Sequence, residues 1–267
     1  GTIKSVRMED PIRPVDLDAF FYNCRKLESV DMSLLDTSRT KSMRGMFVSA
    51  GVSADVLDFA RLDTSNVTDM AWLFSGMKAT ELDLSALDTR NVKNFSYMFE
   101  NASNLESLDL STLNTDNAEN MSGMFTGCGK LTELAVDTLN TSKVTDMQRM
   151  FSGCSGLADL SIGSGIKTIG TAAFRGCSTL DEITIPNSVT TIKEDAFVNC
   201  ENLKQIYIPA SVSSIEEHAL GYERYTYHDY IFSGEWITKY RLYLDFSICG
   251  VIGSAAHEYA QQNNIPF

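Results

Sequence analysis

Short stretches of the chain alternate between apolar and polar residues, as in Leu108-Asp-Leu110. This two-residue period predicts a strand with one buried face. A polar cluster follows and is suited to a turn, and then Met121 and Met124–Phe125 recur at i, i+3 and i+4. That second spacing favours one side of a short helix. Each unit therefore reads as a strand, a corner, a return segment and a second corner.

The unit recurs along most of the chain, and one phenylalanine marks each copy. Successive marker phenylalanines are 23 to 27 residues apart: Phe21, Phe47, Phe74, Phe99, Phe125, Phe151, Phe174 and Phe197. A repeat of this length is typical of a solenoid, in which each coil buries its apolar face against its neighbours. We therefore expect about eight stacked coils, whose strands form one parallel sheet and whose Leu, Met and Phe side chains stack inside.

The repeated clause changes at Leu157, which predicts an organisation in four parts. Residues 1–14 are a lead-in, 15–156 form a solenoid of 25–27-residue repeats, 157–220 form one of 23-residue repeats, and 221–267 form an aromatic-rich C-terminal cap. Within the cap, Ser254 to Gln262 predicts an amphipathic helix with Ala255, Ala256 and Tyr259 facing inward.

Both repeat clauses resemble those of a known family. The 23-residue clause L-x-x-I-x-I-P-x-S-V-x-x-I-x-x-x-A-F-x-x-C at Leu180–Cys200 resembles the BspA-like (Treponema pallidum-type) leucine-rich repeat. The 26-residue clause D-T-S-x-V-T-D-M, as at Asp63–Met70, resembles the lipoprotein-type repeat of the same bacterial surface proteins, and Phe246–Phe267 resembles their closing segment.

The resemblance implies an α/β repeat fold: a right-handed leucine-rich-repeat solenoid with a parallel concave sheet and short helical or irregular convex segments. It also implies an exported or surface-anchored protein that works by adhesion or partner binding. The family supplies no catalytic residues, so none are expected here.

Net charge and hydropathy limit the partners. The formal charge is −13, which argues against nucleic acid because phosphates require a basic footprint. No apolar run approaches the roughly 20 residues that span a bilayer, so no membrane insertion is expected. We expect an extracellular or cell-surface location, and we expect the signal or anchor sequence to lie outside this segment.

Five of the six cysteines follow a marker phenylalanine by three residues: Cys24, Cys128, Cys154, Cys177 and Cys200. Alanine or methionine fills the same slot in the other coils, at Ala50, Met77 and Ala102. A slot that accepts alanine or cysteine requires a small apolar group, and a buried free thiol meets that need. We therefore predict free cysteines rather than disulfides.

The outward strand positions are the first candidate binding surface. One column carries Asp31, Asp58, Asp83 and Asp109 and ends at Tyr207; the adjacent column adds Glu81, Glu133, Asp159 and Glu182. Neighbouring strands lie about 5 Å apart, so these carboxylates repel one another and favour a basic protein segment. A solvated face with no ligand and a calcium site are the alternatives, although calcium needs six to eight wrapped oxygens.

An aromatic-rich stretch in the tail is the second candidate surface. It contains Tyr222, Tyr225, Tyr227 and Trp236, and it begins where the last coil ends. Terminal coils must cover an exposed apolar edge, so capping by a tyrosine-rich hairpin is the favoured interpretation. A glycan or protein site that uses these exposed aromatic side chains is the alternative.

Catalytic signatures do not emerge from the sequence. The tail contains the residue types of a Cys-His-Asp arrangement: Cys249, Asp245, His218, His228 and His257. No known motif surrounds the cysteine, however.

We predict a non-enzymatic cell-surface binding module without cofactor or metal, of the adhesin type, that holds a protein ligand on its concave face. The alternatives are a structural spacer that presents other domains, and glycan binding through the tail aromatics.

Overall fold

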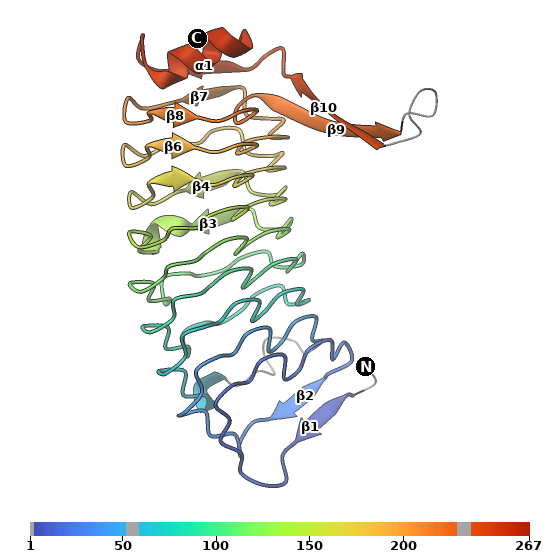
Figure 1. Cartoon of the computed structure of the whole chain (residues 1–267). Helices are drawn as coiled ribbons and strands as arrows, with labels where there is room; N and C mark the ends of the chain where they lie inside the picture. The colour runs from blue at the N-terminus through green and yellow to red at the C-terminus, as the bar shows by residue number, and fades with distance from the viewer. Residues whose placement is uncertain (1–2, 52–58, 229–235) are drawn as a thin grey trace.

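The structure is a computed structural model that describes residues 3–51, 59–228 and 236–267, with the backbone alone for Asp159, Tyr227 and His228. The chain winds into a stack of coils, and the two termini lie at opposite ends of the stack (Figure 1). Each coil returns to the same set of positions one repeat later, so equivalent residues lie above one another. This arrangement confirms the predicted leucine-rich-repeat solenoid.

Short parallel strands join the coils on two sides of the stack. On the first side the pairs are β1 (Ser5–Arg7) with β2 (Ser29–Asp31), β3 (Glu133–Ala135) with β4 (Asp159–Ser161), and β7 (Gln205–Tyr207) with β11 (Ser247–Cys249). On the second side β5 (Thr168–Ile169), β6 (Thr191–Ile192) and β8 (Ser214–Ile215) form a three-stranded parallel sheet. In the N-terminal coils single parallel bridges continue that second side, from Asp16 through Ser42, Asp69, Asn94 and Asn120 to Asp146.

Little helix accompanies these strands. The 3₁₀ turns η2 (Phe59–Arg61) and η3 (Val136–Thr138) occur at corners, and α1 (Ala255–Asn263) closes the chain. The antiparallel pair β9 (Tyr222–His228) and β10 (Trp236–Leu242) projects sideways from the last coils (Figure 1).

The marker phenylalanines form one continuous column through the core. Successive rings stack with centroids 4.8 to 6.2 Å apart and planes within 19° of parallel, from Phe21 to Phe197. All eight are buried, and buried methionine and leucine side chains surround them. The predicted internal ladder of stacked apolar residues is therefore present.

The return segment that carries each marker phenylalanine is irregular rather than helical. The residues two before and two after each phenylalanine have a left-handed backbone, for example Tyr97 (φ 57°) and Asn101 (φ 55°) around Phe99. The N–H groups of these three residues donate to carbonyls of the next coil at 2.8, 2.9 and 2.7 Å. A helix would instead direct each N–H four residues back within its own segment. Bonding between coils thus replaces the expected helical bonding.

The cysteine slot faces the core, and all six cysteines are free. Four buried thiols each donate to the carbonyl of a marker phenylalanine in the preceding coil, at 3.1 to 3.2 Å: Cys128 to Phe99, Cys154 to Phe125, Cys177 to Phe151, and Cys200 to Phe174. Burial raises the pKa of these thiols, to about 12 for Cys200. The slot is therefore structural, as its alternation with alanine indicated.

The last coil is covered by β11 and α1 rather than by the tyrosine-rich hairpin. Phe246 and Ile248 beside and within β11 are buried, as are Ala256, Tyr259 and Ala260 of α1. Ser254 caps α1 by accepting the His257 N–H at 3.4 Å. Strand β10 has no fully buried residue, because the hairpin projects sideways and does not lie over the core (Figure 1).

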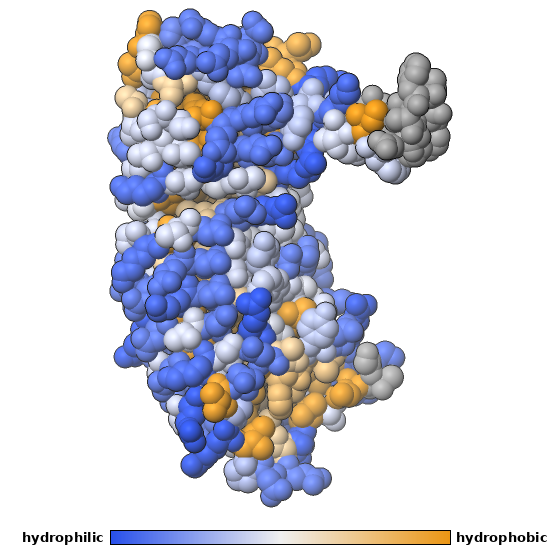
Figure 2. All heavy atoms as spheres, in the orientation of Figure 1, coloured by the Kyte–Doolittle hydropathy of each residue, from blue (hydrophilic) through white to orange (hydrophobic). Residues whose placement is uncertain are grey.

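The two ends of the stack expose more apolar surface than the coils between them. Ile3, Val15 and Phe20 are exposed near the N-terminus, and Leu244 and Ile252 are exposed near the C-terminus. Figure 2 shows apolar residues gathered over the N-terminal coils and a mainly hydrophilic surface above them. Among the described residues, exposed large apolar side chains are therefore scarce on the middle of the stack.

Candidate functional site

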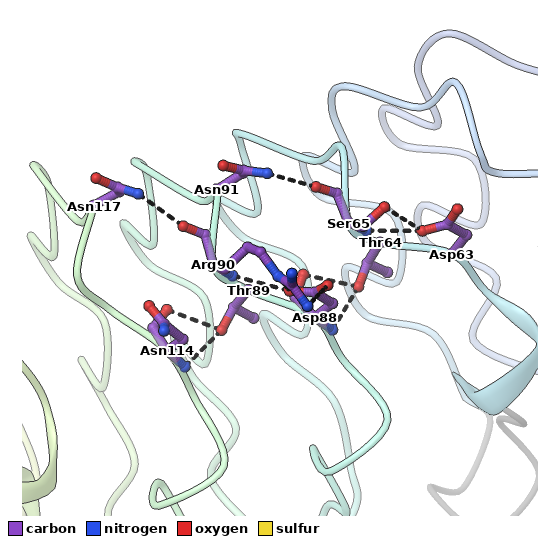
Figure 3. Close-up of polar contacts among 9 residues, drawn as sticks. All are labelled: Asp63, Thr64, Ser65, Asp88, Thr89, Arg90, Asn91, Asn114 and Asn117. Carbon is purple, nitrogen blue, oxygen red and sulfur yellow. Dashed lines mark hydrogen bonds and ion pairs between the residues drawn. The ribbon is translucent and has the colours of Figure 1, made fainter.

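The polar D-T-S clause fastens neighbouring coils together (Figure 3). The Thr89 hydroxyl donates to the Asn114 carbonyl at 3.0 Å and accepts the Asn114 N–H at 2.8 Å. Thr64 bonds in the same way to Asp88, and Thr115 to Asn140. The clause is thus a structural element that links coils, whereas the sequence predicted for it a turn and the capping of helical amides. The sequence does contain a signal for this contact between coils, because threonine recurs at the same repeat position in five coils: Thr37, Thr64, Thr89, Thr115 and Thr141.

The other polar residues of the clause are used in a similar way. Asn91 donates to the Ser65 carbonyl at 2.7 Å, and Asn117 donates to the Arg90 carbonyl at 2.9 Å (Figure 3). The Asp63 carboxylate accepts the N–H of Ser65, two residues later. These contacts leave few side chains of the clause available to a ligand.

We use the term strand face for the outward positions of the strands on the first side of the stack and of the equivalent segments in the other coils. Its described candidates are all exposed, as the alternation predicted: Asp31, Asp83, Asp109, Glu81, Glu133, Glu182 and Tyr207. Asp58 lies outside the described residues, and the side chain of Asp159 is not described. The strand face therefore offers acidic groups and one exposed tyrosine to solvent.

Each aspartate of the strand face also holds its own turn. Asp31, Asp83 and Asp109 accept the N–H of the serine two residues later at 3.0, 2.9 and 2.9 Å. Hydrogen bonds from these serines hold the pKa of all three carboxyls below its ordinary value. The charge on Asp83 acts in the opposite direction and raises the pKa of Asp109. The two carboxylates are thus close enough to interact.

Asp31 differs from the other two because basic residues are near it. Arg7 of β1 lies 3.9 Å from its carboxylate, and Arg61 also lowers its pKa. Among the described residues, no cation forms an ion pair with Asp83 or Asp109. Asp83 and Asp109 are therefore unneutralised, and Glu81, Glu133 and Glu182 of the strand face likewise form no ion pair among the described residues.

Two depressions continue along the strand face from Asp109. The first has a volume of about 420 Å³ and is lined by Asp109, Glu133, Ala135 and Ser161. The second, of about 560 Å³, is lined by Ser161, Glu182, Thr184 and Tyr207. Both are lined by Ser161, so together they form a shallow track with acidic side chains beside it.

The strand face does not assemble a metal site from its described residues. Among all the described residues, one group of three side chains is close enough to hold a metal ion: Glu194, Asp195 and His218, near the base of the hairpin. Tyr240 of β10 stacks on His218 at 3.7 Å and donates to Asp195 at 3.2 Å. Arg224 lies 3.9 Å from the same carboxylate, so the group anchors the hairpin and already has a cation beside it.

The four tail aromatics do not share one surface. Tyr222 is half-buried against His218 and donates to Asn263 at 2.8 Å. Tyr225 lies opposite Lys239, whereas Trp236 lies opposite His228, and strand alternation places these two positions on opposite faces of the hairpin. Trp236 is 72% exposed. The side chain of Tyr227 is not described.

The candidate catalytic residues have separate partners. Asp245 pairs with Lys204 at 3.0 Å. His257 accepts the Gly253 N–H at 3.1 Å, and its ring packs on Phe267. Among the described residues, no hydrogen bond joins Cys249 to either side chain. The structure therefore does not bring this arrangement together.

Stacked coils with an exposed acidic strand face define a leucine-rich-repeat solenoid whose broad surface is available to ligands. The sequence matches the family described as "Mycoplasma protein of unknown function, DUF285" over residues 12–59 and 49–162, which together exceed half of the chain. The chain belongs to this family. The match ends close to Leu157, where the 26-residue clause gives way to the 23-residue one.

Several solved bacterial structures are similar in part. A leucine-rich cell surface protein from Faecalibacterium prausnitzii is 19% identical, with 80% of this chain and 79% of that chain covered and a TM-score of 0.34. A leucine-rich repeat protein from Eubacterium ventriosum is 20% identical (73% and 70% covered, TM-score 0.39). One from Bacteroides ovatus is 15% identical (95% and 68% covered, TM-score 0.40).

No curated protein matches the chain. Within the described residues, no helix has both the length and the apolar composition needed to cross a bilayer.

Proposed function

We propose that this chain is a non-enzymatic binding module of a cell-surface protein, and that its strand face holds an extended basic segment of a protein ligand. The observation that supports this most directly is the acidic track that runs from Asp109 past Glu133 and Glu182 to Tyr207, with exposed Asp83 at the equivalent position of the preceding coil. The surface location rests on the resemblance of the repeat clauses to those of bacterial surface proteins.

Spacing and charge fit a ligand strand that runs along the stack. Neighbouring coils lie about 4.8 Å apart, and alternate residues of an extended peptide are about 6.6 Å apart. Lysine or arginine at alternate positions therefore supplies roughly three cations for every four coils that the peptide crosses. Exposed ion pairs contribute about 0.2–1 kcal/mol each, so affinity depends on several of them acting together.

The test uses a twelve-residue peptide with lysine at alternate positions and serine between them. Fluorescence anisotropy at low and at moderate salt should show saturable binding that weakens as salt rises. Asp83→Asn with Asp109→Asn should weaken binding about three- to tenfold, and adding Asp31→Asn and Asp58→Asn should abolish it.

A matched control carries Asp10→Asn and Asp116→Asn, two exposed aspartates outside the strand face. It has the same net charge as the double variant and should bind the peptide as the unmodified chain does. Equal loss in both variants would indicate a response to net charge alone and would reject the strand face as the site.

A structural spacer is the second candidate, and the internal use of the D-T-S clause favours it. A spacer that presents other domains should show no saturable binding to the basic peptide, to matrix proteins or to glycans. Glycan binding through the hairpin predicts a change in Trp236 fluorescence on a glycan panel, which Trp236→Phe should remove.

A further inference from the structure

The coils are held together on the second side of the stack by a regular series of backbone hydrogen bonds. Thr68 N–H donates to Lys41 C=O, and the series continues through Lys93 and Glu119 to Thr145, with N···O distances of 2.8 to 2.9 Å. It resumes in the C-terminal coils, where Thr190 N–H donates to Lys167 C=O at 2.9 Å. Each coil is thus bonded to the next at one recurring position.

The series is interrupted once, between Thr145 and Lys167. All residues of these two segments are described, and no lateral backbone hydrogen bond or parallel bridge joins 145–147 to 167–169. The interruption lies where a 26-residue coil meets the first 23-residue coil. Because the shorter coil cannot follow the path of the longer one, the stack opens on this side.

The opening is a notch of about 480 Å³, within the range of small-ligand sites. Val144 and Met147 line it and are half-buried, whereas the equivalent Val92 and Met121 are fully buried in closed coils. The Thr145 C=O and the Met147 N–H, both in the lining, have no backbone hydrogen-bond partner among the described residues. The notch therefore combines an apolar wall with unpaired polar backbone groups.

Three lysines from successive coils surround this notch: Lys143, Lys167 and Lys193. Lys193 pairs with Glu216 at 2.5 Å, and Lys143 donates to Asn117 at 2.9 Å. Lys167 has no ion-pair partner among the described residues. Asp146 is the one acidic residue in the lining, so positive charge prevails there although the chain as a whole is strongly acidic.

We propose that the notch binds a carboxylated sugar residue. The carboxylate would pair with Lys167 and Lys143. The C–H face of the pyranose ring would pack on Val144 and Met147. Ring hydroxyls would bond to the unpaired C=O of Thr145 and the unpaired N–H of Met147. Pockets of this kind combine an apolar wall with a few polar groups that fix orientation. The site is separate from the strand face and does not depend on the basic-segment proposal.

The test follows the Met147 methyl signal in protein labelled with ¹³C at the methionine methyl groups, assigned through Met147→Leu. Trigalacturonate is the probe, and its neutral methyl ester and inorganic phosphate are the comparison ligands. Trigalacturonate should shift the Met147 signal saturably, and the ester should bind at least tenfold more weakly. Equal affinity for the ester, or for phosphate, would overturn the assignment to a carboxylated sugar.

Variants locate the site. Lys143→Gln with Lys167→Gln should weaken trigalacturonate binding at least tenfold. The matched control is Lys41→Gln with Lys93→Gln, because Lys41 and Lys93 belong to the same series of positions in coils whose lateral bonds are intact. Equal weakening by both pairs, or no saturable shift at Met147 in the unmodified protein, would overturn the proposal.

Discussion

Thr89 and Asn114 are joined by two hydrogen bonds across adjacent coils, because one hydroxyl both donates to the carbonyl and accepts from the N–H of the same residue. Thr89 itself is buried. The side chain therefore takes the place of a backbone partner for Asn114. A stack that depends on such contacts loses stability wherever one hydroxyl is removed.

Thr89→Val should lower the free energy of unfolding by about 2 kcal/mol, because valine keeps the shape and leaves two backbone groups of Asn114 without partners. Urea denaturation followed by circular dichroism measures the change. Thr112→Val provides the control, since Thr112 is exposed and makes no side-chain hydrogen bond in the described structure. If both variants unfold at the same denaturant concentration, the hydroxyl of Thr89 contributes no net stability.

Gly123→Ala should destabilise the protein through two separate effects. Gly123 has a φ of 61°, and a β-carbon added there would lie 2.2 Å from the Tyr97 ring. The left-handed backbone costs about 1–2 kcal/mol for a residue with a β-carbon, and displacement of the ring adds to this. The denaturation midpoint should fall accordingly.

Gly253→Ala isolates the backbone effect, because Gly253 also has a positive φ (81°) and no atom lies within 4 Å of an added β-carbon. It should cost less than Gly123→Ala. Combining Gly123→Ala with Tyr97→Ala should cost less than the sum of the two single changes, since the collision is then absent. An additive result would assign the whole effect to the backbone.

Sequence periodicity was sufficient to predict the stack and its interior. The spacing of the marker phenylalanines predicted a stacked column, and Phe99 and Phe125 stack with centroids 5.5 Å apart. Residues 254–262 predicted the closing helix because the spacing of inward-facing Ala256 and Tyr259 is a local signal. The helix depends on a local pattern and the column depends on a regular repeat, and a single sequence displays both.

The return segment and the junction notch could not be predicted in this way. Left-handed positions are occupied by residues as different as Trp72, Tyr97, Gly123 and Arg149, so composition gives no signal for them. The notch arises from a mismatch between two coil lengths, and its three lysines are 24 and 26 residues apart in the sequence. Asp83 and Asp109 were predicted to share a face, but their use as turn-forming acceptors appears in the structure alone.

The buried thiols should resist alkylation in the folded protein. Iodoacetamide at pH 8 should modify the half-buried Cys24 and Cys249, whereas Cys128, Cys154, Cys177 and Cys200 should react once the chain is unfolded. The physical reason is that thiolate is the reactive form, and burial opposes its formation. Peptide mass mapping before and after denaturation measures this, and early labelling of Cys154 would contradict the structure.

The same thiols make stability depend on alkaline pH. Their pKa is raised in the folded state, so above about pH 8.5 the unfolded chain ionises first and stability falls, until the folded thiols also ionise near pH 12 for Cys200. The slope reaches about 1.4 kcal/mol per pH unit for each thiol. Cys200→Ala should show a shallower decline between pH 8 and 9.5, and Cys249→Ala serves as the control. Equal slopes in the two variants would reject the link to the buried thiol.

Neutralising one aspartate of the strand face should change the titration of its neighbour. The Asp83 charge raises the pKa of Asp109, so Asp83→Asn should lower the pKa of Asp109, while asparagine still accepts the Ser85 N–H and keeps the turn. Carboxyl ¹³C shifts measured from pH 2 to 7 report the titration of Asp109.

Because hydrogen bonds hold the folded-state pKa of Asp109 below the unfolded value of about 3.9, its contribution to stability is present above that pH and is lost as the pH falls through the folded-state value. Asp88→Asn is the control, since Asp88 pairs with Arg90 at a corner. An unchanged Asp109 titration in Asp83→Asn would mean that the two carboxylates act independently, and the acidic track would then lack the mutual repulsion that favours a basic ligand.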